Sequence, residues 1–420
     1  MENTILEELS WRGLINQVTD EDKLKEILES PAKIYVGVDP TADSMHVGHL
    51  LPLLILKRFL NYGHTPVVLA GGGTGQIGDP SGRSSERSML SVEEIQSNTQ
   101  KIINQFKKIL DVKDNEGKVI IKNNNDWLSE ISVIEFLRDY GKFFSVNTML
   151  AKEVVASRLD SGISFTEFSY QILQSLDWYK MYKEDNVQIQ LGGSDQWGNI
   201  TAGTDLIRKK DPEALVAGIT MPLILKSDGT KFGKSAGGSV WLDRDKTSPY
   251  QLYQFFLNSA DKDVIHYLKV FTFLSKEEID GLEKDLEENP HLRAAQKKLA
   301  QEMVTLIHSD EDYQQALSIS QALFSGDIAH LDYDVIQSSF EGVPTSTING
   351  EELNIVDFLV DGGICKSKRE AREFISNNSI TINGIKTNDL EATIKKSDAF
   401  NEKVTIVRRG KKNYFKVDWS

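Results

Sequence analysis

Two histidines in the stretch HVGH, His46 and His49, lie three residues apart on either side of Gly48. On a helix, side chains three positions apart share a face, so both imidazoles can contact one ligand, and the glycine leaves room for a bulky planar group. The stretch opens an apolar helical pattern, and a helix N-terminus favours an anion such as phosphate. A metal site would need further ligands nearby, and HVGH offers none. Capping and surface polarity remain the alternative for such a pair on its own.

A second group of cations, Lys231 and Lys234, lies among glycines in LKSDGTKFGKSAGG. A mobile basic loop of this kind can close over a polyphosphate and stabilise the charge that develops during group transfer. On its own such a stretch is often only a solvated turn. Together with HVGH it favours a site for a polyphosphate.

The glycine-rich stretch GGGTGQIGD follows an apolar strand pattern and contains Gly73, Gly75 and Gly78 at the spacing of a dinucleotide fingerprint. That fingerprint requires its third glycine to open an apolar helix, whereas here a proline and a glycine follow at once in DPSGRSSER. No lysine follows at the spacing of a phosphate-binding loop either. The stretch therefore predicts a loop that lets a ligand approach the backbone, with Asp79 offering a charge to an amine.

Three polar residues in YQILQSLD, namely Tyr170, Gln174 and Asp177, are spaced i, i+4 and i+7. This spacing places them on one face of a helix among aliphatic neighbours. An ordinary solvated helix face would give the same pattern, but the aliphatic neighbours suit a helix that lines a polar pocket.

The elements that would position these residues alternate along the chain. KIYVGVD reads as a strand, HVGHLLPLLILKRFLNYG as a helix that stops at Gly63, and TPVVLAGGG as a buried strand. VQIQLGGSDQWGNITAGTDLIRKK repeats strand, glycine loop and helix. The pattern predicts an α/β fold with a Rossmann-like parallel sheet, whose ligands gather at the carboxyl ends of the strands.

The rest of the chain predicts further domains. We expect the sheet domain over residues 1–225, the lysine loop and a charged helical domain over 226–322, a linker over 323–350, and a small α+β domain over 351–420. The last should contain two short helices and a β-hairpin that turns at Asn383 and Gly384.

Composition narrows the class of protein. The 420 residues carry a net charge of −14, yet Gly362 to Ser420 holds 13 Lys and Arg against 7 Asp and Glu, which leaves −20 on the preceding 361 residues. A basic end on an acidic chain suggests a polyanionic partner for the tail, or only a solvated surface. The single Cys365 excludes an internal disulfide. Neither a signal peptide nor a membrane span is recognisable, so we expect a cytoplasmic location.

HVGH resembles the HIGH signature and KFGKS the KMSKS signature of the class I aminoacyl-tRNA synthetases. The order and separation of the two match, and FTEFSYQILQSLDWYKMY and QLGGSDQWGNITAGTDLIRK are similar to the bacterial tyrosyl-tRNA synthetases. The resemblance covers essentially the whole chain, including a tail that resembles the small RNA-binding fold first described in a ribosomal protein. Each signature is moderately specific, and the set is highly specific.

The resemblance implies a reaction. The carboxylate of tyrosine attacks the α-phosphate of ATP, pyrophosphate leaves with Mg²⁺, and the tyrosyl group passes to the terminal adenosine of tRNA. Such chemistry needs positioning and charge stabilisation more than a nucleophile from the protein. The residues that the resemblance places around the phosphates are Thr41, His46, His49, Lys231, Lys234, Arg83 and Arg87. Those that it places around ATP and the adenylate are Asp39, Gly48, Gly193, Asp195, Gln196 and again Lys234.

The resemblance also assigns the amino-acid pocket and the RNA surface. Tyr35 and Asp177 match the two residues that hydrogen-bond the phenolic hydroxyl of tyrosine in the family. Phenylalanine lacks this hydroxyl, and the rejection of phenylalanine on this ground is a well-known property of the tyrosyl-tRNA synthetases. Asp79, Tyr170 and Gln174 should meet the amino group. The basic residues expected to contact tRNA phosphates are Lys366, Lys368, Arg369, Arg372, Arg408, Arg409, Lys411 and Lys412. The family implies a homodimer in which one tRNA crosses from one subunit's catalytic domain to the other's tail, the helical domain lying on the anticodon side.

Two departures and three alternatives remain. Phe232 and Gly233 replace Met and Ser of KMSKS, which removes a hydroxyl and adds flexibility, whereas Val47 for Ile is a small change. A tryptophanyl-tRNA synthetase is disfavoured by Tyr35 and Asp177, and a catalytically inactive RNA-binding relative by the intact signatures. A nicotinamide-dependent dehydrogenase is disfavoured by the failed glycine fingerprint.

Overall fold

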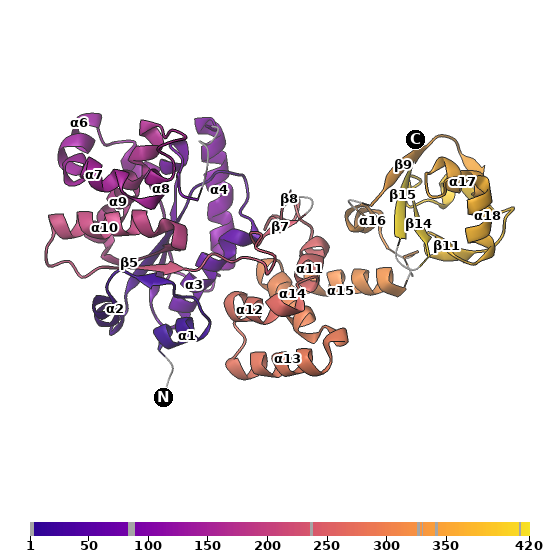
Figure 1. Cartoon of the computed structure of the whole chain (residues 1–420), viewed down its shortest axis with the longest axis horizontal. Helices are drawn as coiled ribbons and strands as arrows, with labels where there is room; N and C mark the ends of the chain where they lie inside the picture. The colour runs from indigo at the N-terminus through magenta and orange to yellow at the C-terminus, as the bar shows by residue number, and fades with distance from the viewer. Residues whose placement is uncertain are drawn as a thin grey trace. The chain divides into compact units, whose positions relative to one another are not determined.

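The structure is a computed structural model (Figure 1) that describes residues 4–82, 89–235, 238–325, 328–329, 331–340, 343–410 and 413–420. The chain divides into two compact units. Unit 1 consists of Met1–Lys246 and Ser259–Leu299, and unit 2 of Thr247–Asn258 and Ala300–Ser420.

Unit 1 is built on a six-stranded sheet with the strand order β1-β6-β5-β2-β3-β4. The strands are β1 (Gln17–Val18), β2 (Lys33–Val38), β3 (Thr65–Ala70), β4 (Ile120–Asn123), β5 (Val187–Gly193) and β6 (Ala217–Met221). From β6 to β4 every neighbouring pair is parallel, which confirms the predicted parallel-sheet α/β fold. β1 pairs antiparallel with β6 and makes the sheet mixed. A two-residue strand is too short to show the alternation that reveals strands in a sequence.

Helices cover this sheet. The α-helices that lie wholly in unit 1 are α1 (Ile5–Trp11), α2 (Glu21–Leu28), α3 (Leu50–Asn61), α4 (Val92–Ile109), α5 (Asn125–Leu128), α6 (Val133–Glu135), α7 (Val146–Leu150), α8 (Glu153–Ala156), α9 (Phe165–Asp185), α10 (Trp197–Lys210), α12 (Asp261–Phe271) and α13 (Lys276–Glu288). The predicted stop at Gly63 of the helix that follows HVGH is confirmed, because α3 ends at Asn61 and Gly63 has a φ of +84°. α9 begins where Ser164 caps the Glu167 amide and ends at the left-handed Asn186.

The central strands are buried on both faces, as parallel strands between helices must be. All five residues of β6 are buried, and so are five of the six in β3. α3 is equally apolar: its buried residues include Leu50, Leu53 and Leu54. The core therefore forms a rigid base under the loops at the carboxyl ends of the strands.

Unit 2 contains helices and a small sheet. Its helices are α11 (Pro249–Leu257), α15 (Asp310–Ser325), α16 (Tyr333–Ser339), α17 (Ile355–Asp361) and α18 (Lys368–Ser376), while α14 (Ala294–Ile307) continues from unit 1 into unit 2. Its strands are β9 (Thr345–Ile348), β10 (Glu352–Asn354), β11 (Ile380–Ile382), β12 (Ile385–Thr387), β13 (Thr393–Lys395), β14 (Val404–Arg409) and β15 (Asn413–Trp419). The predicted hairpin is confirmed: β11 and β12 pair antiparallel around Asn383 (φ +46°) and Gly384 (φ +85°).

The structure differs from the expected domain boundaries in two places. Residues 323–350, expected as a linker, contain α16 and β9, and β9 pairs in parallel with β15 inside the five-stranded sheet β12-β11-β14-β15-β9. Unit 1 extends beyond residue 225, because α12 and α13 belong to it. Among the described helices, none is long and apolar enough to cross a membrane.

Candidate active site

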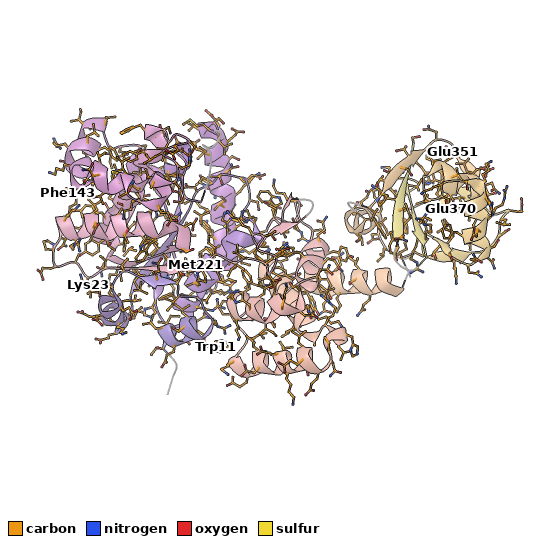
Figure 2. The ribbon with its side chains drawn as sticks, viewed as in Figure 1. Trp11, Lys23, Phe143, Met221, Glu351 and Glu370 are labelled. Atoms are coloured by element: carbon orange, nitrogen blue, oxygen red, sulfur yellow. The ribbon has the colours of Figure 1, made fainter. Side chains whose placement is uncertain are left out.

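A cavity of about 290 Å³ lies where β2, β3, β5 and β6 end. Met221, labelled in Figure 2, is the last residue of β6 and lines it. The sequence-predicted residues that line the same cavity are Tyr35, Asp39, Thr41, Gly48, His49, Asp79, Tyr170, Gln174, Asp177, Gly193, Asp195 and Gln196. The structure therefore brings together residues from four separate stretches of the sequence.

Tyr35 and Asp177 are deeply buried polar residues of this cavity, with 1% and 2% of their surfaces exposed. The hydroxyl of Tyr35 has no hydrogen-bond partner among the described residues. Burial raises the pKa of Tyr35 well above its usual value, and the nearby charge of Asp177 adds to this. Because buried hydroxyls nearly always find a partner, this one is suited to a polar atom of a ligand.

The carboxyl of Asp177 accepts two hydrogen bonds, from Asn124 Nδ2 at 2.9 Å and from Trp127 Nε1 at 2.8 Å. Burial raises its pKa from 3.8 to about 7, although the two donors act in the opposite direction. Sequence reasoning missed both Asn124 and Trp127. The signal that could have found Asn124 is its place directly after β4, at the same edge of the sheet as the predicted loops.

A hydrogen-bonded chain continues from Asn124 across the cavity. Asn124 donates to Thr74 Oγ1 at 2.8 Å, and Thr74 donates to Asp39 Oδ1 at 2.7 Å. The hydroxyl of Tyr170 donates to Asp39 Oδ2 at 2.8 Å. Thr74, in the glycine loop, was also missed. The chain fixes the orientation of Asp39 and of Asp177 at once.

A second polar cluster lies around Asp79. Gln196 Nε2 donates to Asp79 Oδ2 at 2.7 Å, and Asn199 Nδ2 lies 3.1 Å from both Gln174 Oε1 and Gln196 Oε1. Burial and the charge of Asp79 raise the pKa of Asp195, while the charge of Lys231 lowers it. The cavity is therefore lined by several carboxyl groups, with the cation of Lys231 near Asp195. Such a lining suits an ammonium inside and an anion toward the lysine.

The two histidines of HVGH stack on each other, with ring centroids 3.9 Å apart at 26°. His46 caps the start of a 3₁₀ turn, Val47–His49, and His49 is the last residue of this turn, which leads into α3. His46 Nδ1 accepts from the Gly48 amide at 3.1 Å, and His49 Nδ1 from the His46 amide at 3.3 Å. A Cβ on Gly48 would lie 2.8 Å from the His46 ring, so glycine is required for this packing. His49 lines the cavity.

The lysine loop is hydrogen-bonded to HVGH through its backbone. The amide of Val47 donates to Val240 O at 2.9 Å, that of Leu242 to Met45 O at 2.8 Å, and that of Val240 to Gly233 O at 3.0 Å. Gly233 has a φ of +91°, and a Cβ there would lie 2.9 Å from Val47 Cγ2. Beyond Lys231 the loop includes β7 (Lys234–Ser235) and β8 (Gly238–Ser239), which pair antiparallel.

Several predicted residues cannot be placed at the site. Arg83, Arg87, Lys411 and Lys412 lie outside the described residues, as does the side chain of Lys234. Within the described ranges no group of three or more His, Cys, Asp and Glu side chains is arranged to hold a metal ion.

The predicted RNA-contact residues of unit 2 differ in their surroundings. Lys366, Lys368, Arg369 and Arg372 are exposed at or near the start of α18, and Lys368 pairs with Asp357 at 2.6 Å.

Arg408 and Arg409 are only partly exposed. Arg409 donates to Ile364 O and stacks on Phe374 and Phe415 at 5.2 Å each. Its guanidinium therefore packs within the fold of unit 2, whereas the exposed cations of α18 remain open to a polyanion.

Comparison with known proteins identifies the family of this chain. Residues 28–325 match the family model described as tRNA synthetases class I (W and Y), and residues 335–417 match the tyrosine–tRNA ligase SYY-like C-terminal domain. The chain belongs to the class I tRNA synthetases. It is 56% identical over 413 residues to tyrosine–tRNA ligase 1 of Enterococcus faecalis, covering 98% of each chain. It is 54% identical over 417 residues to the tyrosine–tRNA ligase of Listeria monocytogenes, covering 99% of each.

Among solved structures, this class I synthetase is similar to a C-terminally truncated mitochondrial tyrosyl-tRNA synthetase of Aspergillus nidulans. The TM-score is 0.70 at 34% identity, over 77% of this chain and 95% of that one. The matches to the two tyrosine–tRNA ligases cover 98% and 99% of this chain and therefore include residues of both units, which agrees with the resemblance drawn from HVGH and KFGKS.

Gly233→Ala should release the lysine loop from HVGH, because the new Cβ would meet Val47 and the residue would be strained at positive φ. Such strain costs about 1–3 kcal/mol. We expect faster hydrogen–deuterium exchange at the amides of Val47, Val240 and Leu242, measured by mass spectrometry. Gly229→Ala is the matched control, since Gly229 also has positive φ (+82°) but nothing lies within 4 Å of its Cβ position. Equal exchange in both variants would contradict the role given to the Val47 contact.

Proposed function

We propose that this protein activates tyrosine with ATP and transfers the tyrosyl group to tRNA. The observation that carries the assignment is the buried hydroxyl of Tyr35, which has no hydrogen-bond partner among the described residues and is close enough to Asp177 to feel its charge. The phenolic hydroxyl of a bound tyrosine is both donor and acceptor, so it can donate a hydrogen bond to Asp177 and accept one from Tyr35. The relatives of 54–56% identity are tyrosine–tRNA ligases, which supports the same substrate.

The remaining polar groups of the cavity fit the other end of tyrosine. Its ammonium would meet Asp79, Tyr170 and Gln174, whose oxygens lie in the two hydrogen-bonded clusters. Asp39 stays oriented by Thr74 and Tyr170. The aromatic ring would then lie between the Tyr35 end and the Asp79 end of the cavity, with its carboxylate toward the histidines.

ATP would bind at HVGH and the lysine loop. Asp39, Gly48, Gly193, Asp195 and Gln196 would surround the adenylate. The phosphates would meet Thr41, His46, His49 and Lys231, and also Lys234, Arg83 and Arg87. These cations and imidazoles would stabilise the charge as the tyrosine carboxylate attacks the α-phosphate and the bond to pyrophosphate breaks.

Mg²⁺ would come with the phosphates of ATP, whose charge it neutralises. In the cavity, Asp39 and Asp79 accept hydrogen bonds from neighbouring side chains, and Asp195 feels the charges of Asp79 and Lys231. Among the described residues these carboxyl groups do not form a cluster of three or more ligands that could bind a metal ion without ATP. In the second step the terminal adenosine hydroxyl of tRNA attacks the carbonyl of the adenylate, and AMP leaves.

The tRNA would reach unit 2 through the exposed cations Lys366, Lys368, Arg369 and Arg372. Arg408, Arg409, Lys411 and Lys412 remain part of the proposed surface, although Arg409 also stabilises the fold through Phe374 and Phe415. Contacts of this type supply affinity through phosphates more than sequence reading. The cytoplasmic location expected from the sequence remains a prediction.

A homodimer is the second part of the proposal, and it is supported by an apolar surface in unit 1. Large apolar side chains that are exposed between residues 133 and 165 are Val133, Ile134, Leu137, Val146, Leu159 and Phe165. Phe165, 74% exposed, is the first residue of α9, whose later turns carry Tyr170, Gln174 and Asp177. So many exposed apolar side chains within one segment of the chain support its use as an interaction surface.

Exchange of labelled pyrophosphate into ATP, run with each of the twenty amino acids and without RNA, tests the function. We expect exchange with tyrosine alone, because only tyrosine pairs with both Tyr35 and Asp177. Exchange with tryptophan would assign the protein to the tryptophanyl branch of the family, and no exchange with any amino acid would favour an inactive RNA-binding relative.

The variant His49→Ala should lose pyrophosphate exchange far more than it loses tyrosine binding.

Tyrosine affinity should depend on pH through Asp177. Its pKa of about 7 means that the charged acceptor exists above this pH and is lost below it. The Kd for tyrosine, measured by calorimetry without ATP, should therefore rise as the pH falls below about 7, approaching tenfold per pH unit. Asp177→Asn should bind weakly at every pH with a flat profile. A wild-type Kd that stays constant down to about pH 5.5 would contradict this role.

Phe165→Asp should weaken the proposed dimer, because a charge would be buried in an apolar contact. The mass in light scattering should fall from twice 47.2 kDa to 47.2 kDa. Ile385→Asp is the control, since Ile385 is also exposed (68%) but lies on β12 of unit 2 and is not part of the segment 133–165. A wild-type protein that is already monomeric would refute the proposal of a dimer.

A further inference from the structure

The lysine loop lies on an aromatic platform that belongs to α12. The ring of Phe232 stacks on Phe271 with centroids 4.8 Å apart at 25°, and it meets Tyr267 at 4.8 Å and 57°. Phe232 is 7% exposed and directly follows Lys231. The position of the loop backbone at Lys231 is therefore set by α12 as well as by HVGH.

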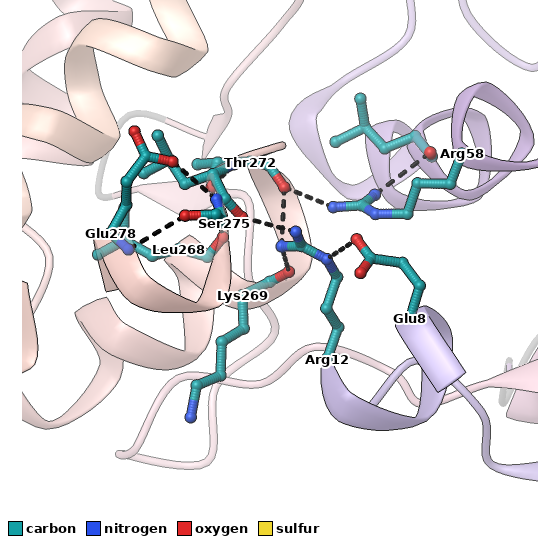
Figure 3. Close-up of polar contacts among 10 residues, drawn as sticks. Glu8, Arg12, Arg58, Leu268, Lys269, Thr272, Ser275 and Glu278 are labelled. Carbon is teal, nitrogen blue, oxygen red and sulfur yellow. Dashed lines mark hydrogen bonds and ion pairs between the residues drawn. The ribbon is translucent and has the colours of Figure 1, made fainter. Parts of the chain in front are cut away.

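Two buried arginines hold the C-terminal end of α12 (Figure 3). Arg12, which caps the end of α1, donates to Lys269 O at 2.8 Å, to Thr272 O at 3.1 Å and to Leu274 O at 2.7 Å. Arg58, in the last turn of α3, donates to Thr272 O at 2.6 Å and to its own Leu54 O at 3.2 Å. The carbonyl of Lys269 is one that the end of α12 leaves without a helical partner, and Thr272 is the C-cap residue, so both lie at the negative pole of this helix.

Burying two arginines in this way costs more free energy than a purely structural contact would require. Arg12 and Arg58 are 2% and 1% exposed, and both converge on Thr272. Glu8, 19% exposed at its side chain, is the carboxylate paired with Arg12, at 2.5 Å. Burial, together with the charge of Arg12, lowers the pKa of Arg58 to about 9. Apolar residues would fill the same space without burying two like charges, so the directed hydrogen bonds point to a need for a fixed position.

The arginines connect the two signatures. α3 begins directly after HVGH and ends with Arg58 in its last turn, while α12 ends under Phe232 of the lysine loop. The contact between Arg58 and Thr272 therefore joins the helix that follows the histidines to the helix that supports the lysines. Movement of the α12 end relative to α3 would change the distance between His49 and Lys231.

We propose that Arg12 and Arg58 are positioning residues for the activation step: they fix the end of α12, and through Tyr267, Phe271 and Phe232 they set the lysine loop against HVGH. This rests on the proposed function, because the loop is assigned there to the phosphates of ATP. Neither arginine lines the cavity, so tyrosine binding does not depend on them.

The test uses the full-length chain with Arg58→Met, which keeps the apolar stem and removes the guanidinium. We expect the Kd for tyrosine to change less than about twofold and kcat/KM for ATP in tyrosine-dependent pyrophosphate exchange to fall about tenfold or more. Arg12→Lys, which keeps the charge but not the forked donors, should show a smaller loss of the same kind.

A double-mutant cycle separates this role from a loss of stability. If Arg58 acts through Phe232, then Arg58→Met should cost much less in a Phe232→Ala background than in the wild type. Arg158→Met is the matched control, because Arg158 is also buried (3% exposed). It pairs at 3.0 Å with Glu167, which lies on α9, so it has no part in holding α12. Its effect should be the same in both backgrounds. If Arg58→Met does not fold, the cycle is run with Arg12→Lys.

Additive losses for Arg58 and Phe232 would overturn the inference, as would equal losses in tyrosine binding and ATP turnover. These outcomes differ from failure of the proposed function, in which the wild-type protein itself would show no exchange with tyrosine.

Discussion

Asp177 lies on α9 with 2% of its surface exposed, and a carboxylate in such a place costs free energy unless donors surround it. Asn124 and Trp127 supply two donors, and Asn124 passes the network on to Thr74, Asp39 and Tyr170. Residues that follow β2, β3 and β4 are thereby locked to α9. The network that satisfies this one carboxyl thus orients one side of the cavity, whereas the cluster around Asp79 is held by hydrogen bonds of its own.

The same carboxyl affects stability. Its pKa is raised from 3.8 to about 7 in the folded state, so between these values the folded chain holds a proton that the unfolded chain has released. Stability from this group is therefore present at low pH and is lost as the pH rises through that window. A ligand hydroxyl that donates to Asp177 offsets this loss, which explains how a site can be unstable when empty and selective when filled.

Much of the fold could be predicted from the sequence because its elements follow local patterns, whereas site residues such as Tyr35, Thr41 and Asp195 were expected only from the resemblance to the synthetase family. HVGH at a helix start, Tyr170, Gln174 and Asp177 at helical spacing, and the turn at Asn383 are all readable from neighbours along the chain. Asn124 and Trp127 were missed because their role depends on a contact with α9 that only the folded sheet creates.

Other features needed tertiary structure for related reasons. β1 is two residues long, and β9 forms only because β15 offers it an edge. Arg409 reads as a phosphate contact in VRRGKK, yet in the fold its guanidinium packs on Phe374 and Phe415. A basic residue in a short strand carries no sign of which side chains will cover it, since those come from α18 and β15.

Phe232 and Gly233 are best understood as a pair. From the sequence alone, Gly233 adds flexibility to the loop, but in the fold its missing Cβ is what lets the chain lie against Val47 and Gly48. Phe232 points the other way, into Tyr267 and Phe271. One residue thus brings the loop to the histidines and the next anchors it to α12. A polar or aliphatic residue at 232 would keep the first contact and lose the second, so the pair couples the two signatures more tightly than either residue could alone.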